Sequence, residues 1–95
     1  MKKKIVVTGL GAVCSLGNNV NDMWKNLVNG VSGVTKITKI NTENLDTLIA
    51  AQVDDEFEHE AQKYISKRQK KQMTRSTRMS LLASNQAIED SNLDF

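Results

Sequence analysis

The chain has 95 residues, of which 39% are hydrophobic and only 4% aromatic, so we expect at most one small domain. A chain of this size buries a smaller share of its surface than a full-sized domain, and one cysteine cannot form an internal disulfide. No apolar run approaches the roughly 18 residues of a membrane-spanning helix. The lone cysteine, and the short glycine-broken run after the N-terminal lysines, predict a cytoplasmic location without a secretion signal.

The formal net charge is only +2, but the charges are unevenly distributed along the chain. Residues 41–60 carry seven acidic side chains and no lysine or arginine, whereas residues 61–88 carry seven basic side chains and no acid. Such a division is typical of two solvated faces. It also fits a docking surface for an acidic partner.

The first part of the chain predicts a strand, a loop and a helix. Ile5-Val6-Val7-Thr8 is a β-branched run that favours a strand buried on both faces. A loop with three glycines follows, and Asn19 is expected to cap a helix that ends near residue 29. Gly30 fits the left-handed position after that helix. One side of the helix is expected to be buried, through Met23, Trp24, Leu27 and Val28.

The second part predicts mostly loop over residues 31–45, with weak alternation at 34–40, and a strand over residues 48–53. A short basic helix is expected at residues 66–72, and a long helix from Thr74 to about Ser91. The apolar residues near one face of the long helix are Met79, Leu82, Ala83, Ala87 and Ile88. Its small residues, which predict close packing against another element, are Ser80, Ala83, Ser84 and Ala87.

The order strand, helix, strand, helix indicates an α/β fragment. An apolar strand at residues 5–8 needs neighbouring strands on both edges and helices on both faces. These 95 residues offer no obvious partners for it. The pattern therefore points to sequence beyond this segment.

Thr8-Gly9-Leu10-Gly11, between a strand and a helix, raises the question of nucleotide binding. The dinucleotide fingerprint requires a third glycine where Cys14 stands, and no Gly-Lys-Ser/Thr sequence follows for a phosphate loop. We therefore interpret these glycines as residues that permit tight turning and close backbone approach. No cofactor is expected.

Cys14 is the only cysteine and His59 the only histidine. A reactive cysteine needs a base or an electropositive pocket that lowers its pKa. His59 lies in an acidic stretch far along the chain, and nothing in the sequence brings the two together. We expect Cys14 to be a buried small residue and His59 a surface residue, with no metal site and no catalytic residue in this chain.

Lys67-Arg68-Gln69-Lys70-Lys71 is a strongly basic segment. A solvated helix face would explain it from composition alone. Nucleic-acid binding is disfavoured, because stacking aromatics are absent around the segment apart from Tyr64. An acidic protein is at least as good a partner on these grounds.

The opening sequence IVVTGLGAVCSLGN, residues 5–18, resembles the start of the elongating β-ketoacyl-[acyl carrier protein] synthases. That family begins with a VVTGLG strand and turn, followed by LG and a helix that carries a tryptophan. Trp24 and residues 29–33 fall where the family has its WxxLxxGxSG pattern. The similarity resumes at residues 51–54 and continues through Met73 to residue 93.

The resemblance implies the N-terminal part of a thiolase-fold (β-ketoacyl synthase) domain, an α/β fold, with no complete second domain in residues 1–95. It implies an enzyme of fatty-acid or polyketide synthesis, active as a homodimer, that condenses malonyl-[acyl carrier protein] with an acyl thioester. The family's nucleophilic cysteine and its two histidines, or His and Asn, lie beyond Phe95. Cys14 stands where the family commonly has serine, so none of these roles transfers to this chain.

One functional feature carries over from the family in part. Elongating synthases dock the acidic carrier protein on basic residues of the short helix before a conserved methionine. If Met73 is that methionine, Arg68 and Lys71 are docking residues. Gln72 stands where another base is common, and Lys67 and Lys70 are the candidates to replace it.

The pathway and the role of the chain stay open at this stage. The family's Asp-x-Phe after the methionine reads Thr74-Arg75-Ser76 here, a departure from the pattern that resembles polyketide-type relatives. Two alternatives to a condensing-enzyme fragment are a piece of a non-catalytic, chain-length-factor-like partner and a small carrier-protein-binding module. The sequence downstream of residue 95 would distinguish them.

Overall fold

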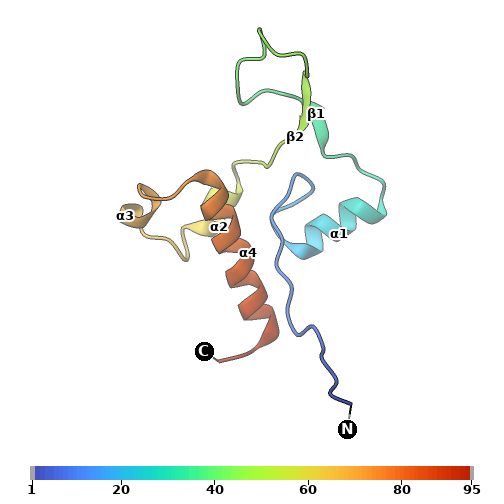
Figure 1. Ribbon diagram of the computed structural model, residues 1–95, viewed down its shortest axis with the longest axis vertical. Coiled ribbons are helices and arrows are strands. Elements are labelled where there is room, and N and C mark those ends of the chain that lie inside the picture. The colour runs from blue at the N-terminus through green and yellow to red at the C-terminus, as the bar shows by residue number, and fades with distance from the viewer. Residues whose placement is uncertain (1, 95) are drawn as a thin grey trace.

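The computed structural model describes residues 2–94. Along this part of the chain the elements are α1 (Val20–Val28), β1 (Val34–Lys36), β2 (Ile49–Ala51), α2 (Phe57–Ala61), α3 (Lys67–Lys70) and α4 (Arg75–Ser91). The molecule measures 59 × 38 × 23 Å along its principal axes. Figure 1 shows three parts: a hairpin at the top, α1 on one side, and α2 and α3 grouped around α4 on the other. No helix within residues 2–94 is long and apolar enough to cross a membrane.

The predicted strand at residues 5–8 does not form. Its three apolar side chains are exposed, up to 94% for Ile5, and no strand among the described residues pairs with it. An isolated extended segment has no neighbour to accept its backbone hydrogen bonds. The segment therefore runs free of the helices toward the N-terminus, as the dark blue trace in Figure 1 shows.

Helix α1 begins and ends as the sequence predicts. The backbone N–H of Asp22 donates to the Asn19 side chain at 2.8 Å, which satisfies one of the free donors at the helix start. Gly30 follows the helix with φ of +71°. The predicted buried side is wrong, however, because α1 buries none of its residues and Trp24 is 61% exposed. No element within residues 2–94 covers this face of the helix.

The two strands form an antiparallel hairpin with Thr35 opposite Ala50. Strand β2 lies inside the predicted range of 48–53, and β1 lies in the stretch whose alternation was weak. The Gln52 carboxamide closes the base of the long connection, because its oxygen accepts from the backbone N–H groups of Thr38 and Lys39 at 3.1 and 3.2 Å. The sheet is thus a hairpin and not the larger sheet that the resemblance implies.

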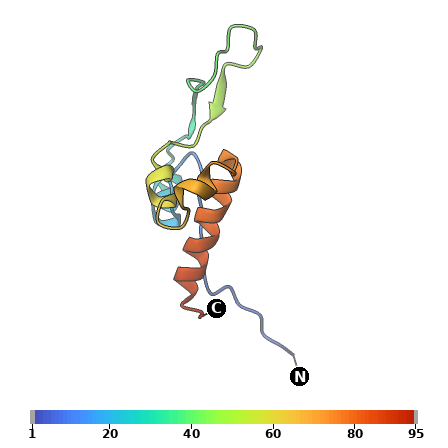
Figure 2. The same cartoon turned by 90° about the vertical axis from the view of Figure 1, so that its left-hand side faces the viewer.

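The buried apolar core of the described residues lies between α2 and α4. Its members are Phe57, Ala61, Ile65 and Leu82. Helix α2 packs against α4, and Figure 2 shows the hairpin rising away from both. The predicted apolar face of α4 is confirmed for Leu82, which is buried, while Ile88 is 43% exposed.

The small residues of α4 do receive another element. The backbone at Gly9 and Gly11 lies so close to Ala87 and Ala83 that a Cβ on either glycine would collide with the helix backbone. The prediction of close backbone approach is therefore confirmed for both glycines. Ser80 and Ser84 lie outside this contact and are exposed.

Candidate functional site

Helix α3 is a single turn fixed by its own cap. The backbone N–H of Gln69 donates to Ser66 Oγ at 3.2 Å, and the backbone N–H of Ser66 donates to Gln69 Oε1 at 3.0 Å. This reciprocal capping box satisfies two donors that the helix itself leaves free. It confirms the predicted short helix. None of its side chains is buried, so its basic residues face solvent.

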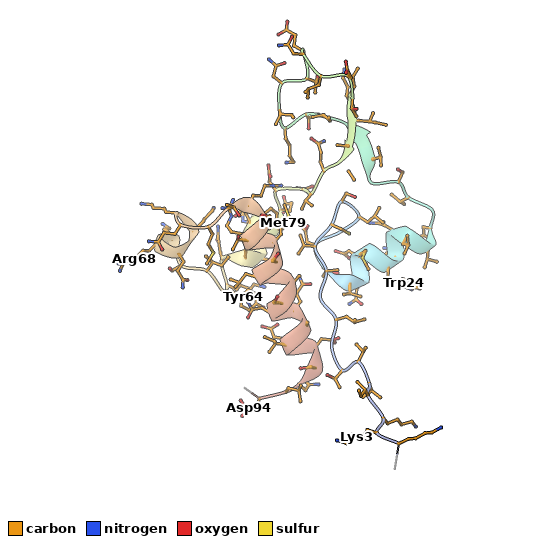
Figure 3. All side chains as sticks on the ribbon, in the orientation of Figure 1. Lys3, Trp24, Tyr64, Arg68, Met79 and Asp94 are labelled. Atoms are coloured by element: carbon orange, nitrogen blue, oxygen red, sulfur yellow. The ribbon has the colours of Figure 1, made fainter. Side chains whose placement is uncertain are left out.

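The structure brings the four basic residues of the sequence prediction together on α3 and its C-terminal cap. All four, Lys67, Arg68, Lys70 and Lys71, are exposed. Figure 3 shows Arg68 at the edge of the molecule, pointing away from α4. Positions three and four apart are neighbours on a helix surface, so Arg68 and Lys71 share a side with Lys67.

Lys70 differs from the other three residues because Glu58 of α2 holds it. Its Nζ lies 3.5 Å from Glu58 Oε2. Lys67, Arg68 and Lys71 form no ion pair with another described residue. We call these three the basic triad. Of the four basic residues on α3 and its cap, these three are therefore the ones free to bind a partner.

Glu58 also pairs with Arg78 of α4. Arg78 Nη2 donates to Glu58 Oε1 at 2.8 Å, and Arg78 Nε contacts both carboxylate oxygens at 3.0 and 3.2 Å. The two side chains are only 16% and 19% exposed. Partial burial raises the pKa of Glu58, but the hydrogen bonds and charge of Arg78 outweigh it and hold that pKa below its usual value.

Two further acids of the acidic segment also pair with basic side chains. Asp55 contacts Lys39 at 2.9 Å and Arg75 at 2.6 Å, and hydrogen bonds from these two lower the pKa of Asp55. Glu60 pairs with Lys63 at 2.9 Å. Ion pairs at three acids therefore bridge the charge division in the sequence, and none of them involves the basic triad.

Tyr64, the one aromatic residue near the basic segment, is turned toward α4. Its hydroxyl donates to Glu89 Oε1 at 2.6 Å, and this bond raises the pKa of the Tyr64 hydroxyl. The ring is held by an acidic partner on α4, not presented beside the basic triad. This geometry gives the triad no stacking platform for a nucleobase.

Cys14 and His59 line two neighbouring cavities, and neither residue lines the other's cavity. The backbone groups of Cys14 and Gly17 exchange hydrogen bonds of 2.9 and 3.2 Å around a tight turn, and Cys14 is half-buried beside an open cavity of about 380 Å³. His59 is exposed, as predicted, and lines a different cavity of about 330 Å³. Residues 2–94 contain no group of three His, Cys, Asp or Glu side chains arranged to hold a metal ion.

The sequence matches one known family over almost its full length. Residues 2–95 fit the family described as beta-ketoacyl synthase, N-terminal domain. The chain is 34% identical over 93 residues to the 3-oxoacyl-[acyl-carrier-protein] synthase 2 of Staphylococcus aureus strain COL. It is 34% identical over 92 residues to the protein of the same name from Synechocystis.

These matches show the class of protein to which the chain belongs. It is a member of the β-ketoacyl synthase family, and residues 2–95 match the N-terminal domain of that family. The alignments cover 98% and 97% of this chain but only 22% and 21% of the two relatives. The chain therefore spans about a fifth of the length of the curated relatives it matches.

The contacts that hold α3 were not found from the sequence. Glu58 and Arg78 are 20 residues apart, a separation that corresponds to no helix or strand periodicity. Composition shows only that acids precede bases. A hint was available in that Glu58 directly follows Phe57, an apolar residue that has to pack on the long helix.

Proposed function

We propose that this chain is the first part of a 3-oxoacyl-[acyl carrier protein] synthase that condenses malonyl-[acyl carrier protein] with an acyl thioester. Membership of the β-ketoacyl synthase family, and relatives named as 3-oxoacyl-[acyl-carrier-protein] synthases, support this proposal. In it, residues 1–95 supply the opening segment of the N-terminal half of a thiolase-fold domain. The complete enzyme is a homodimer of such chains.

The proposed reaction forms one carbon–carbon bond and breaks another. An acyl group is held as a thioester on a cysteine, and the malonyl group loses carbon dioxide. The electron pair left on the malonyl carbon attacks the acyl carbonyl carbon and expels the cysteine thiolate. The separation of Cys14 from His59 supports placing this nucleophile and its partners in chain beyond residue 95.

The surface of the chain supports its assignment to an incomplete domain. Residues 5–7 and one side of α1 present apolar side chains to solvent, including Trp24, Leu27 and Val28. Contiguous apolar surface of this kind marks a region that another element or partner covers. In the proposal, further strands and helices of the same domain cover residues 5–7 and the apolar side of α1.

The basic triad is the part of the chain to which we assign a direct functional contact. It carries three exposed positive charges on one side of α3 with no acidic partner among residues 2–94. An acidic carrier protein would meet these charges in solvent, where each contact contributes about 0.2–1 kcal/mol and is weakened by salt. This triad is the single observation on which the docking role rests.

The test uses the complete synthase that contains this segment. Arg68→Glu with Lys71→Glu adds repulsion to lost attraction, so kcat/KM should fall much more for carrier-protein thioesters than for pantetheine thioesters. Lys25→Glu with Lys36→Glu is a matched control, since it makes the same change in charge at exposed residues outside α3. Equal losses on the two substrate types in the α3 variant would refute the docking role.

A further inference from the structure

Helix α3 cannot hold its own position by apolar packing. It is four residues long and none of them is buried. A single turn of helix is not stable in isolation, because nucleation costs more than one turn of hydrogen bonds returns. Whatever fixes the basic triad in space must therefore lie at the ends of α3 or act through its polar side chains.

From the first turns of α4, Arg78 contacts the segment that follows α3 and, through Glu58, a polar side chain of α3 itself. Its Nη1 donates to the backbone carbonyl of Met73 at 2.9 Å, just after α3. Its Nε and Nη2 bind Glu58, whose other oxygen faces Lys70 Nζ at 3.5 Å. One guanidinium thus ties the segment after α3 directly, and ties α3 itself through a shared carboxylate.

The surroundings make these contacts stronger than surface ion pairs. Arg78 and Glu58 are both less than a fifth exposed, so salt screens them less than exposed charges. A planar guanidinium that binds a carboxylate through two nitrogens also fixes direction, which a single ammonium contact does not. Ile65, buried just before α3, is the apolar anchor at the opposite end of the turn.

We propose that Arg78, acting through Glu58 and the Met73 carbonyl, is a positioning residue that holds the basic triad in the orientation that receives the carrier protein. The inference rests on the docking role proposed above. Arg78 does not touch the carrier protein. It sets the fraction of molecules in which α3 is correctly placed, and the apparent affinity for the partner falls in proportion to that fraction.

The test is Arg78→Gln in the complete synthase, with two readouts. Amide hydrogen exchange of residues 66–73 should accelerate, because the turn loses both tethers. The kcat/KM for carrier-protein thioesters should fall about three- to tenfold, as the docking-competent fraction falls to about a third to a tenth. The kcat/KM for pantetheine thioesters should stay within about twofold of the wild-type value. Both readouts for Arg78→Lys should lie between those of the wild type and those of Arg78→Gln.

Arg75→Gln is the matched control, since it removes the same charge from the same helix. Arg75 binds Asp55 and the Val53 carbonyl and lies over the Phe57 ring, away from α3. Exchange in residues 66–73 should be unchanged in this variant. If Arg78→Gln folds poorly, Arg78→Lys is judged on the same two readouts.

The outcomes separate this inference from the docking role on which it depends. Unchanged exchange in α3, or equal losses on both substrate types in Arg78→Gln, overturns the positioning role. If that happens while reversal of Arg68 and Lys71 is still selective for carrier-protein substrates, docking on α3 stands without Arg78. If the reversal is not selective, the docking role and this inference both fall.

Discussion

The two ends of the chain use apolar residues in opposite ways. Around α2 and α4, Phe57, Ala61, Ile65 and Leu82 are buried against one another, and ion pairs close the rim of that core. Around residues 5–7 and α1, side chains of the same kind are exposed. The two regions have similar apolar side chains. They differ in burial because only the region around α2 and α4 has a packing partner within the chain.

The comparison shows that helices form through contacts close in sequence, whereas burial depends on contacts between distant parts of the chain. Helix α1 has its cap and its terminating glycine, so it forms without burying any residue. A strand has no such local hydrogen bonds, so residues 5–8 stay unpaired when no neighbouring strand is present. The N-terminal region therefore has apolar side chains that no element within residues 2–94 buries.

The largest expected effect is the absence of condensation by the 95-residue chain. Cys14 and His59 are the only cysteine and histidine, and neither of the two cavities that they line contains both residues. Incubation with acyl- and malonyl-carrier protein should give no 3-oxoacyl product. Turnover that Cys14→Ala abolishes would show that the chain holds a catalytic centre.

A pair of leucine substitutions tests the contrast in burial. Leu82 is buried, so Leu82→Ala should cost about 2–5 kcal/mol of unfolding free energy. Leu27 is 52% exposed in this chain, so Leu27→Ala should change the stability of the 95-residue chain by less than about 0.5 kcal/mol. Urea unfolding, or hydrogen exchange where the transition is shallow, measures both.

The same pair sharpens the comparison in the complete synthase. There, Leu27→Ala should become costly, because the proposed remainder of the domain covers α1. A small cost in both contexts would show that the exposed side of α1 is ordinary surface. A sharp cooperative thermal transition of the dilute 95-residue chain would also show that its own core is larger than the four residues at α2 and α4 suggest.

Acid should loosen the ordered region by a smaller amount. The pKa of Glu58 is lowered in the folded chain, so its contribution to stability is present above its ordinary value of 4.5 and is lost as pH falls through the lowered pKa. Exchange of α3 amides, corrected for intrinsic rates, should therefore accelerate below about pH 4.5. Glu58→Gln should remove that pH dependence of exchange. If the pH dependence persists in this variant, other carboxylates cause it.

The sequence predicted what local rules control. Asn19 was expected to cap α1 and does, and α3 and α4 begin directly after Ser66 and Thr74, where the helices were predicted to start. Close approach was predicted separately at the glycines and at the small residues of α4, and the structure shows that Gly9 and Gly11 meet Ala87 and Ala83. The resemblance of the opening segment to β-ketoacyl synthases was confirmed by the family match.

What the sequence did not predict depends on long-range contacts. The burial of α1 and the pairing of residues 5–8 were expected from apolar patterns, but a pattern does not say whether its partner lies within the chain. Within the candidate site, Lys70 looked equivalent to Lys67. Only the fold shows that Glu58 occupies it.

The most direct test of the account is the rate at which an acidic carrier protein associates with the complete synthase. Stopped-flow measurements would compare the wild type, Arg68→Met with Lys71→Met, and Lys25→Met with Lys36→Met, at low and high salt. We expect the α3 double variant to associate about tenfold more slowly at low salt, with the difference shrinking as salt rises. Lys25→Met with Lys36→Met should slow association much less, because it removes the same charge from exposed residues outside α3. Association that is insensitive to the α3 double substitution at low salt would contradict the account.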